Sequence, residues 1–501
     1  MNRYSIRLLL SAVILSSLIL AAGAYLSGLP RKTLGITTKE SFAGVFVPSD
    51  ENEGLYFDTH GFITGSGVYI FLPSYARTDR LVLYSEDEEG GLLERFIHDF
   101  TAGPLKILDE EIFVKQSGLP SVNLSLAPSA PGLSEIEASD KHDLSSKGTM
   151  ELMDQTGFLL REGMTIRGRG NTSWQEDKKS YQLSLSKPKD VLGMGGDEEW
   201  LLLSNAGDYS LLRNEVFLSL SRDLGIDFTP DLRQVDLFIN GEYRGVYSLT
   251  EKPETGKNRV DIGRNDYLYR IGVDKGNYTF LLYDDEEKKG MAEYQPLYGE
   301  LRDSKDRERI ERSMPFVQKV IDEMYDEASS LEDCDLDSFA RYYWLQEFSK
   351  TTDPALRSVY MYWKNDEQAM FMGPAWDYDR TAGIIEMPFR EEDYLWPDGW
   401  TARENDYYKR MFKNPVFIKA VRDCYENDGV REAFDRASGE LPERIENIRR
   451  GAEMNFIRWN GPPEAENNKI EEVYGDTSWE SQIKWLTDWL RLRAEWIGNN
   501  Y

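Results

Sequence analysis

The pattern of apolar and polar residues changes character near residue 251. Before this point, short segments such as "GVYIFLP" and "MTIRGRG" alternate between apolar and polar positions, with Gly, Pro or acidic residues between them. Alternation with a period of two predicts half-buried strands. Beyond residue 251, apolar residues recur every three to four positions, which predicts helices over residues 303–330, 336–352, 405–448 and 478–497. The order, mostly strand and then mostly helix, is typical of an α+β fold.

One helix is also expected within the strand-rich half. The segment "SLLRNEVFLSLSRDLG" places four apolar residues on one helical face and ends at Gly225. These residues are Leu212, Val216, Phe217 and Leu220. Ser204, Asn205 and Asp208 precede this segment and are candidates to cap free backbone N–H groups. Arg213 and Asn214 in its first turn face either a site or water.

Two hairpin-like patterns are visible. In "QVDLFINGEYRGVYSLTE", two alternating strands flank Asn240-Gly241, a dipeptide that favours a type I′ turn. Between the later helical patterns, "SVYMYWK" and the start of "AMFMGPAWDYDRTAG" form a second strand pair. We expect the acidic residues that follow this pair to lie on a connecting loop.

The chain is long enough for more than one domain. We predict a small, sandwich-like β domain over residues 32–148 and a larger domain over residues 149–501. The stretch 127–148 is rich in small and turn-forming residues, and is either a boundary or a hairpin connection.

The first 31 residues have the pattern of an export signal. Arg3 and Arg7 precede an uncharged run from Leu8 to Pro30, and Arg31 and Lys32 follow it. The run is about long enough to span a bilayer, while the small residues near its end also suit a cleavage site. A cleaved signal peptide and a retained membrane anchor both remain open. In either case we expect the protein to act outside the cytoplasm, secreted or anchored at the cell surface.

The net charge, the histidine positions and the cysteine number exclude some classes of protein function. The chain has 88 acidic and 59 basic residues and a formal charge of -29, which disfavours nucleic acid as a partner. All three histidines precede residue 166, so histidine-ligated zinc and His-dependent nucleophilic catalysis are excluded from the larger part of the chain. The two cysteines, Cys334 and Cys424, allow a single disulfide but do not require one.

A basic cluster stands out against this acidic background. In "IRGRGNTSWQEDKKSYQLSL", Arg167 and Arg169 alternate on a strand, and Gly168 and Gly170 would let a ligand approach the backbone. Guanidinium forks bind phosphate, and Lys179 adds a compact positive charge. The alternative is a surface hairpin whose arginines pair with carboxylates of this chain.

Three acids are candidates for metal binding and proton transfer. Asp377 and Asp379 in "WDYD" would lie on one side of an extended segment, a geometry that gathers Mg²⁺ through oxygen ligands. Asp353 in "KTTDPALRS" follows a helical pattern and precedes a strand, where a loop acid can act as a base. In so acidic a chain, solvated surface charge is the alternative.

Four motifs in order resemble those of the spore-coat protein H (CotH) kinase family. They are "RGRGNTSW…KKSYQLSL", "LLSNAGDYSLLRNEV", "VDLFINGEYRGVYSLTEK" and "GPAWDYDRTAG", and the resemblance covers about Met150 to Tyr501. It implies an atypical, two-lobed protein-kinase-like domain that uses ATP and Mg²⁺ or Mn²⁺ to phosphorylate serine or threonine on proteins.

The resemblance also implies which residues hold the nucleotide. Arg167, Arg169 and Asn171 belong to the basic nucleotide loop of the family. Lys179 resembles the strand lysine on the nucleotide phosphates, and Glu251 falls where a kinase chain crosses between its lobes.

The acids map onto the catalytic side of the same family. Asp353 resembles the catalytic-loop aspartate, and Asp377 resembles the metal-binding aspartate, with Asp379 as a second candidate. The second metal ligand of kinases is an asparagine five residues after the catalytic aspartate, where this chain has Ser358, so one metal ion is plausible. Glu215 is the candidate partner of the strand lysine.

Three functions are compatible with this pattern. The first is an exported kinase that phosphorylates a surface or secreted protein. The second is a catalytically inactive, nucleotide-binding or structural surface scaffold of the same fold. The third is a carbohydrate-active protein, since paired acids and many aromatic residues also suit sugars, although it leaves the basic cluster unexplained.

Overall fold

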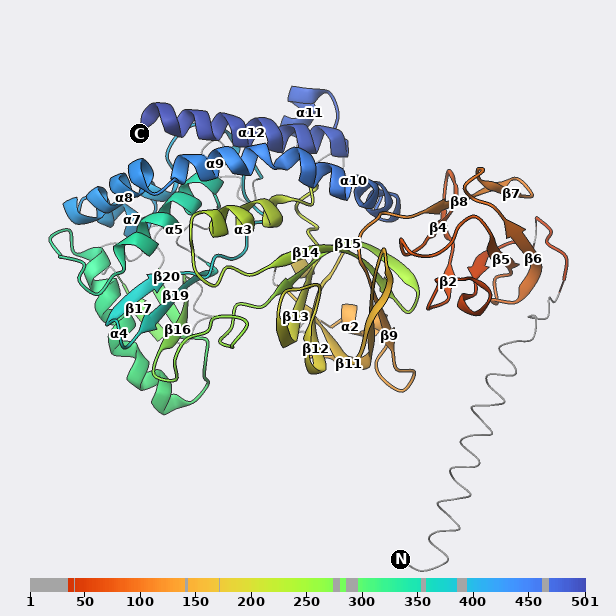
Figure 1. Ribbon diagram of the computed structural model, residues 1–501, viewed down its shortest axis with the longest axis horizontal. Coiled ribbons are helices and arrows are strands. Elements are labelled where there is room, and N and C mark those ends of the chain that lie inside the picture. Colours follow the sequence, from red (N-terminus) through yellow and green to blue (C-terminus); the bar gives the residue numbers. More distant parts are fainter. Residues whose placement is uncertain are drawn as a thin grey trace, which may run out of the picture. The chain divides into compact units, whose positions relative to one another are not determined.

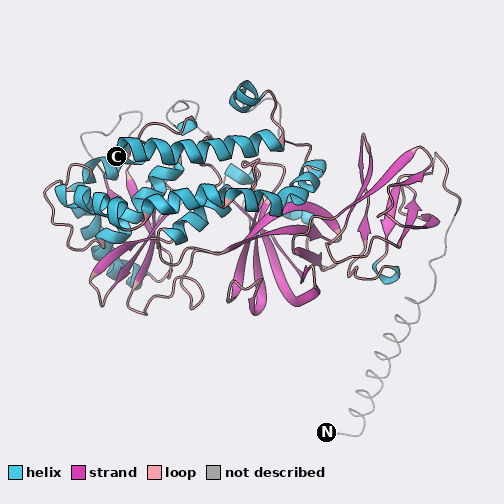
Figure 2. Ribbon diagram, turned by 45° about the horizontal axis from the view of Figure 1, so that its top comes forward, coloured by secondary structure: helices cyan, strands magenta, loops and turns pink. Residues whose placement is uncertain are grey.

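The structure is a computed structural model of a mixed α+β protein with several sheets (Figures 1 and 2). It describes residues 35–39, 41–139, 143–170, 172–273, 280–284, 296–352, 357–384, 394–461 and 468–501. Contacts divide the chain into two compact units. The first comprises residues 1–125, 150–161 and 236–245, and the second comprises residues 126–149, 162–235 and 246–501.

Two four-stranded sheets form the N-terminal part of the first unit. Their orders are β2-β1-β5-β6 and β3-β4-β8-β7. The strands are β1 (Gly44–Val47), β2 (Thr59–His60), β3 (Phe62–Thr64), β4 (Gly67–Phe71), β5 (Leu81–Glu86), β6 (Leu92–His98), β7 (Leu105–Ile107) and β8 (Glu110–Lys115). Val45 and Leu83 from one sheet and Val68 and Ile112 from the other share one buried core. The two sheets therefore pack face to face.

Seven further strands close into a barrel in the order β10-β11-β12-β13-β15-β14-β9. They are β9 (Ser121–Leu126), β10 (Ser145–Asp154), β11 (Gly157–Arg169), β12 (Ser180–Asp190), β13 (Gly196–Leu203), β14 (Leu232–Ile239) and β15 (Glu242–Glu251), with the short helix α2 (Leu133–Glu137) between β9 and β10. Asn240 and Gly241 join β14 to β15 with φ angles of 52° and 80°. Two consecutive positive φ values are typical of the predicted type I′ turn, which is confirmed.

Helix α3 (Arg213–Asp223) lies between β13 and β14 in the sequence and confirms the helix predicted there. The four apolar residues of its predicted face are all buried, and they are Leu212, Val216, Phe217 and Leu220. Gly225 follows the helix with a φ of 72°, as expected of a C-terminal glycine. The buried face packs against α5 and α9.

A five-stranded sheet in the second unit has the order β17-β18-β16-β19-β20. Its strands are β16 (Tyr267–Gly272), β17 (Phe280–Tyr283), β18 (Leu297–Leu301), β19 (Val359–Lys364) and β20 (Ala369–Met372). On one face, the Tyr269 hydroxyl donates to the Ser313 carbonyl of α4 at 2.8 Å. On the other face, Leu268 and Tyr362 share a buried cluster with Leu201 of β13. The sheet therefore lies between helix α4 and a barrel strand.

Helices fill most of the remaining C-terminal part (Figure 2). They are α4 (Arg307–Tyr325), α5 (Leu336–Ser349), α7 (Asp406–Met411), α8 (Pro415–Asn427), α9 (Val430–Gly439), α10 (Leu441–Arg458), α11 (Asn468–Tyr474) and α12 (Trp479–Asn500). The long pattern predicted over 405–448 is divided among four of them. Asn414 caps α8 by accepting the Val416 N–H at 2.9 Å, and Gly429 precedes α9 with a φ of 74°. These caps and turns end one helix and begin the next, although the spacing of apolar residues along the sequence continues across them.

Several sequence predictions concern residues outside those described. The prediction for the apolar segment from Leu8 to Pro30 is one of these. No helix among the described residues is long and apolar enough to cross a bilayer.

Two other predictions concern the cysteines and the domain boundaries. Cys334 and Cys424 are free and buried, so they do not form the disulfide that the sequence allowed. The predicted domain boundaries at residues 31 and 148 stay predictions.

Candidate functional site

The basic cluster lies at the end of β11 and the start of β12. These strands are antiparallel, and Arg169 is paired with Ser180, directly after Lys179. Arg167 is exposed, and its Nη2 donates to the Gln182 Oε1 of β12 at 2.8 Å. Arg169 is half-buried. The two arginines share one face of β11, and Lys179 directly precedes the residue paired with Arg169.

The glycines in this cluster make room for the protein's own side chains. A Cβ on Gly168 would lie 2.3 Å from the Trp174 ring, and a Cβ on Gly170 would lie 2.4 Å from the Ser173 Oγ. The Lys179 Nζ donates to the Trp174 carbonyl at 2.6 Å and lies 5.3 Å from the centre of its ring. We expected these glycines to let a ligand approach the backbone. The space beside them is instead filled by the turn that holds Lys179.

The acidic half of the site follows strand β20. Asp377 is exposed, and its Oδ2 accepts a hydrogen bond from the Ser358 Oγ at 2.9 Å. Both residues have left-handed backbones, with φ of 73° at Asp377 and 55° at Ser358. Such angles are uncommon outside glycine and cluster at functional sites. The segment is therefore not extended at Asp377, but the two predicted metal ligands contact each other.

The basic and acidic halves meet at Arg169. Its Cζ lies 5.7 Å from the centre of the Trp376 ring, directly before Asp377 in the sequence. Desolvation lowers the pKa of the Arg169 guanidinium, and the charges of Asp377 and Asp379 oppose that shift. The contact with Trp376 places Arg169 beside the segment that carries both acids. Tertiary structure thus joins residues about 200 positions apart in one site.

Two further arginines lie near this site and were not predicted. Arg270 of β16 is paired across the sheet with Tyr360 of β19 and with Glu300 of β18. Its Nη2 lies 2.7 Å from Glu300, whose other oxygen lies 3.1 Å from the Nη1 of Arg302. Desolvation raises the pKa of the Tyr360 hydroxyl, and the charges of Arg302, Arg270 and Arg169 oppose that shift. Only strand register brings these cations together, so the sequence carried no signal for them.

The segment that carries the acids is held by the start of α3. Arg213 is fully buried, and its side chain donates to the carbonyls of Thr381 at 2.8 Å and Ala382 at 3.1 Å. Its Nη1 donates to Asp208 at 2.6 Å, and Asp208 also accepts the backbone N–H of Arg213 at 2.8 Å. The predicted capping role of Asp208 is confirmed.

A second contact from α3 reaches the same segment. The Asn214 Oδ1 accepts the backbone N–H of Tyr378, between the two acids, at 2.9 Å. Asn205 supports it, because its Oδ1 accepts from Asn214 at 3.4 Å while its Nδ2 donates to Ser248 at 2.7 Å. Arg213 and Asn214 therefore face the segment that carries the acids rather than water.

The comparison with known protein families agrees with this arrangement. The family model "CotH kinase protein" matches residues 166–497, from the basic strand to helix α12. The chain belongs to the CotH kinase family. The resemblance inferred from the four motifs is confirmed, and no curated protein matches the chain.

Two residues that the family resemblance suggested for the nucleotide site are bound by their own chain. The Glu251 carboxylate lies 2.6 Å from Arg259 and accepts the Asp231 N–H at 2.7 Å, and desolvation raises its pKa to about 7. Glu215 contacts Arg444 at 2.9 Å rather than Lys179. Both carboxylates therefore have partners within their own chain.

Asp353 and Asn171, two further residues suggested by the resemblance, lie outside the described residues. Among the residues that are described, no three His, Cys, Asp or Glu side chains form a metal cluster. Mg²⁺ commonly uses only one or two protein carboxylates together with water and substrate phosphates. The exposed Asp377 carboxylate and the Ser358 hydroxyl beside it fit such a partial ligand set.

Proposed function

We propose that this chain is a phosphotransferase that transfers the terminal phosphoryl group of ATP to serine or threonine of a surface or secreted protein. One observation carries the proposal. Arg169, which belongs to the basic strand pair, lies beside the segment that carries the Asp377 and Asp379 carboxylates. Phosphoryl transfer depends mainly on positioning and charge neutralisation, and a site of this kind offers both.

The basic residues would bind the nucleotide phosphates. Arg167 is exposed and Arg169 half-buried, and guanidinium groups can bind phosphate oxygens in pairs. Lys179 uses one donor on the Trp174 carbonyl, which orients its ammonium group and leaves further donors for phosphate. A nearby phosphate would also favour the charged form of Arg169, which desolvation disfavours.

The acidic residues would complete the site. Mg²⁺ or Mn²⁺, when bound, neutralises phosphate charge, and the oxygens of Asp377 and Ser358 would hold it, with Asp379 as a further candidate. We propose that the Asp353 carboxylate accepts the proton of the acceptor hydroxyl. The hydroxyl oxygen then bonds to the terminal phosphorus as the bond to ADP breaks.

We also propose that the reaction takes place outside the cytoplasm. The proposal rests on Arg3, Arg7 and the apolar run from Leu8 to Pro30, which have the pattern of an export signal. A retained segment would hold the enzyme at the membrane, and a cleaved one would release it. Mass determination of the exported chain distinguishes the two.

A transfer assay with terminally labelled ATP and Mg²⁺ or Mn²⁺ tests the function. We expect Asp377→Ala to lose metal-dependent nucleotide binding, and Asp353→Ala to retain binding but lose transfer. Asp109→Ala is a matched control, because Asp109 is 73% exposed and pairs only at the surface with Lys39. Equal binding and transfer in both site variants would contradict the proposal. Nucleotide binding without transfer in the unaltered chain would instead support the scaffold alternative.

A further inference from the structure

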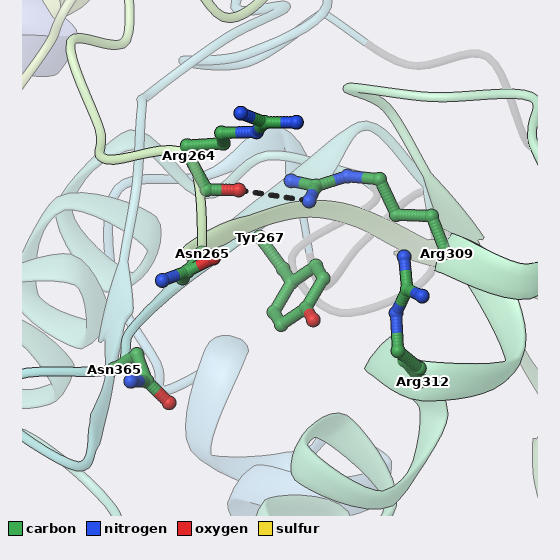
Figure 3. Close-up of a pocket in the computed structure, with 6 residues that line it drawn as sticks. All are labelled: Arg264, Asn265, Tyr267, Arg309, Arg312 and Asn365. Atoms are coloured by element: carbon green, nitrogen blue, oxygen red, sulfur yellow. Dashed lines mark hydrogen bonds between the residues drawn. The ribbon is translucent and has the colours of Figure 1, made fainter.

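A second basic pocket lies on helix α4 and the turns beside it. It has a volume of about 620 Å³, and its six lining residues include no acid. They are Arg264, Asn265, Tyr267, Arg309, Arg312 and Asn365. Figure 3 shows Tyr267 in the middle, with Arg309 and Arg312 from α4 on one side and Asn265 and Asn365 on the other. Three arginines in one pocket are unexpected in a chain with a formal charge of -29.

Arg309 forms a rigid wall of this pocket. Its Nη1 donates to the Arg264 carbonyl at 2.9 Å, its Nη2 donates to the Asp266 carbonyl at 2.7 Å, and its guanidinium lies 4.7 Å from the centre of the Tyr267 ring. Its Nε also donates to Asp303 at 3.1 Å, and the charge of Asp303 neutralises that of Arg309. The wall is therefore ordered before any ligand arrives.

The turns that carry the other lining residues are also fixed. One Asp266 carboxylate oxygen accepts the Asn365 N–H at 2.9 Å, and the other accepts the Gly263 N–H at 2.7 Å. This carboxylate joins the turn before β16 to the turn between β19 and β20. Arg264, Asn265 and Asn365 are thus presented from a preformed frame.

The remaining two arginines supply uncompensated charge. Arg264 and Arg312 are exposed, and neither guanidinium has an ion-pair partner within the part of the chain that the structure describes. Because Asp303 offsets Arg309, Arg264 and Arg312 supply the two positive charges available to a ligand, beside the Asp266 carboxylate, which accepts two backbone N–H groups of the frame. A phosphate monoester carries nearly two negative charges at neutral pH, whereas a carboxylate carries one. Guanidinium geometry also matches phosphate oxygens.

We propose that this pocket binds a phosphate monoester. It is separate from the nucleotide site, because Tyr267 faces α4, where its ring stacks on Phe316 at 5.6 Å. Arg270, three residues further along β16, pairs instead with Glu300 on the face near Tyr360. The bound group is therefore not the phosphoryl group that is transferred, and the inference does not rest on the proposed kinase activity.

Calorimetric titration of the full chain tests the pocket. The probes are inorganic phosphate, a phosphoserine peptide and the same peptide with aspartate in place of phosphoserine. We expect Arg264→Gln/Arg312→Gln to weaken binding of both phosphate probes about tenfold or more, since each lost contact is a charge-assisted hydrogen bond. Arg307→Gln/Arg491→Gln is the matched control, because those side chains are 90% and 59% exposed and pair only along their own helices. The control should bind as the unaltered chain does.

Further measurements separate this site from the nucleotide site. Phosphate binding should persist in Arg169→Gln, and ATP binding should persist in Arg264→Gln/Arg312→Gln. Binding should weaken several-fold between about pH 7.5 and about pH 5.5 as the phosphate loses its second charge. Tighter binding of the phosphopeptide than of inorganic phosphate identifies a protein-borne ligand, and equal binding identifies a small phosphate. Unchanged binding in the double variant, or equally tight binding of the aspartate peptide, would overturn the proposal.

Discussion

The Asn214 Oδ1 of helix α3 accepts the backbone N–H of Tyr378 at 2.9 Å. Tyr378 lies between Asp377 and Asp379, so this bond helps to hold the segment that presents both acids. Arg213, the preceding residue, binds the carbonyls just beyond the same segment. The first turn of α3 therefore sets the position of the acidic half of the site.

Replacing Asn214 with alanine should weaken both stability and metal-dependent nucleotide binding. The buried Tyr378 N–H would lose its partner, which costs about 1–3 kcal/mol. Thermal unfolding measures the first effect and calorimetric titration with Mg-ATP the second. Asn427→Ala is the control, because Asn427 is exposed and donates only to a carbonyl one turn earlier in its helix. Full nucleotide affinity in Asn214→Ala would show that Asp377 is positioned without this bond.

Breaking the buried pair of Asp208 and Arg213 should be more costly. Both side chains are almost completely buried, at 1% and 0% exposure, and lie 2.6 Å apart. Arg213→Met leaves an unpaired buried carboxylate, and we expect a loss of about 3–5 kcal/mol in the free energy of unfolding. Urea denaturation measures this loss, and Asp208→Asn/Arg213→Met should recover part of it. Equal losses in the single and double variants would argue against an uncompensated charge as the cause.

Gly168→Ala tests the packing of the basic turn. The new Cβ would clash with the Trp174 ring, and overpacking of this kind costs about 1–3 kcal/mol. Because the Trp174 carbonyl holds Lys179, we also expect weaker ATP binding. Gly439→Ala is a matched control, since a Cβ at that helical position has no atom within 4 Å. The control should be neutral or slightly stabilising, and a similar result for Gly168→Ala would show that Trp174 can move aside freely.

The raised pKa of Glu251 predicts a dependence of stability on pH. Its pKa in the fold is about 7 because of desolvation, above the usual value of 4.5, so the folded state holds this proton more tightly than the unfolded state. The contribution of Glu251 to the free energy of unfolding should therefore fall as pH rises from about 4.5 to about 7, and stay level above. Urea denaturation of the unaltered chain and of Glu251→Gln measures it as their difference at each pH. A difference that grows with pH over this range would mean that the bond to Arg259 outweighs desolvation.

The secondary-structure elements and turns of this protein could be predicted from short stretches of its sequence. The alternating strands, the Asn240-Gly241 turn and the face of α3 depend on interactions among neighbouring residues, and all three are as predicted. The four ordered motifs likewise identified the family, because residue type and order are themselves sequence properties. The basic and acidic residues were recognised as candidates for the same reason.

The tertiary structure decided which of these residues meet. Arg169 lies near Asp377 only because β11 of the barrel approaches the segment after β20, and no local pattern encodes that approach. Arg270 joins Glu300 and Tyr360 only through the register of three strands. Gly168 and Glu251, which the sequence suggested as ligand contacts, have partners in their own chain. Sequence alone thus determined the elements and their chemistry, whereas long-range packing determined the site, because contacts between distant segments depend on the whole fold.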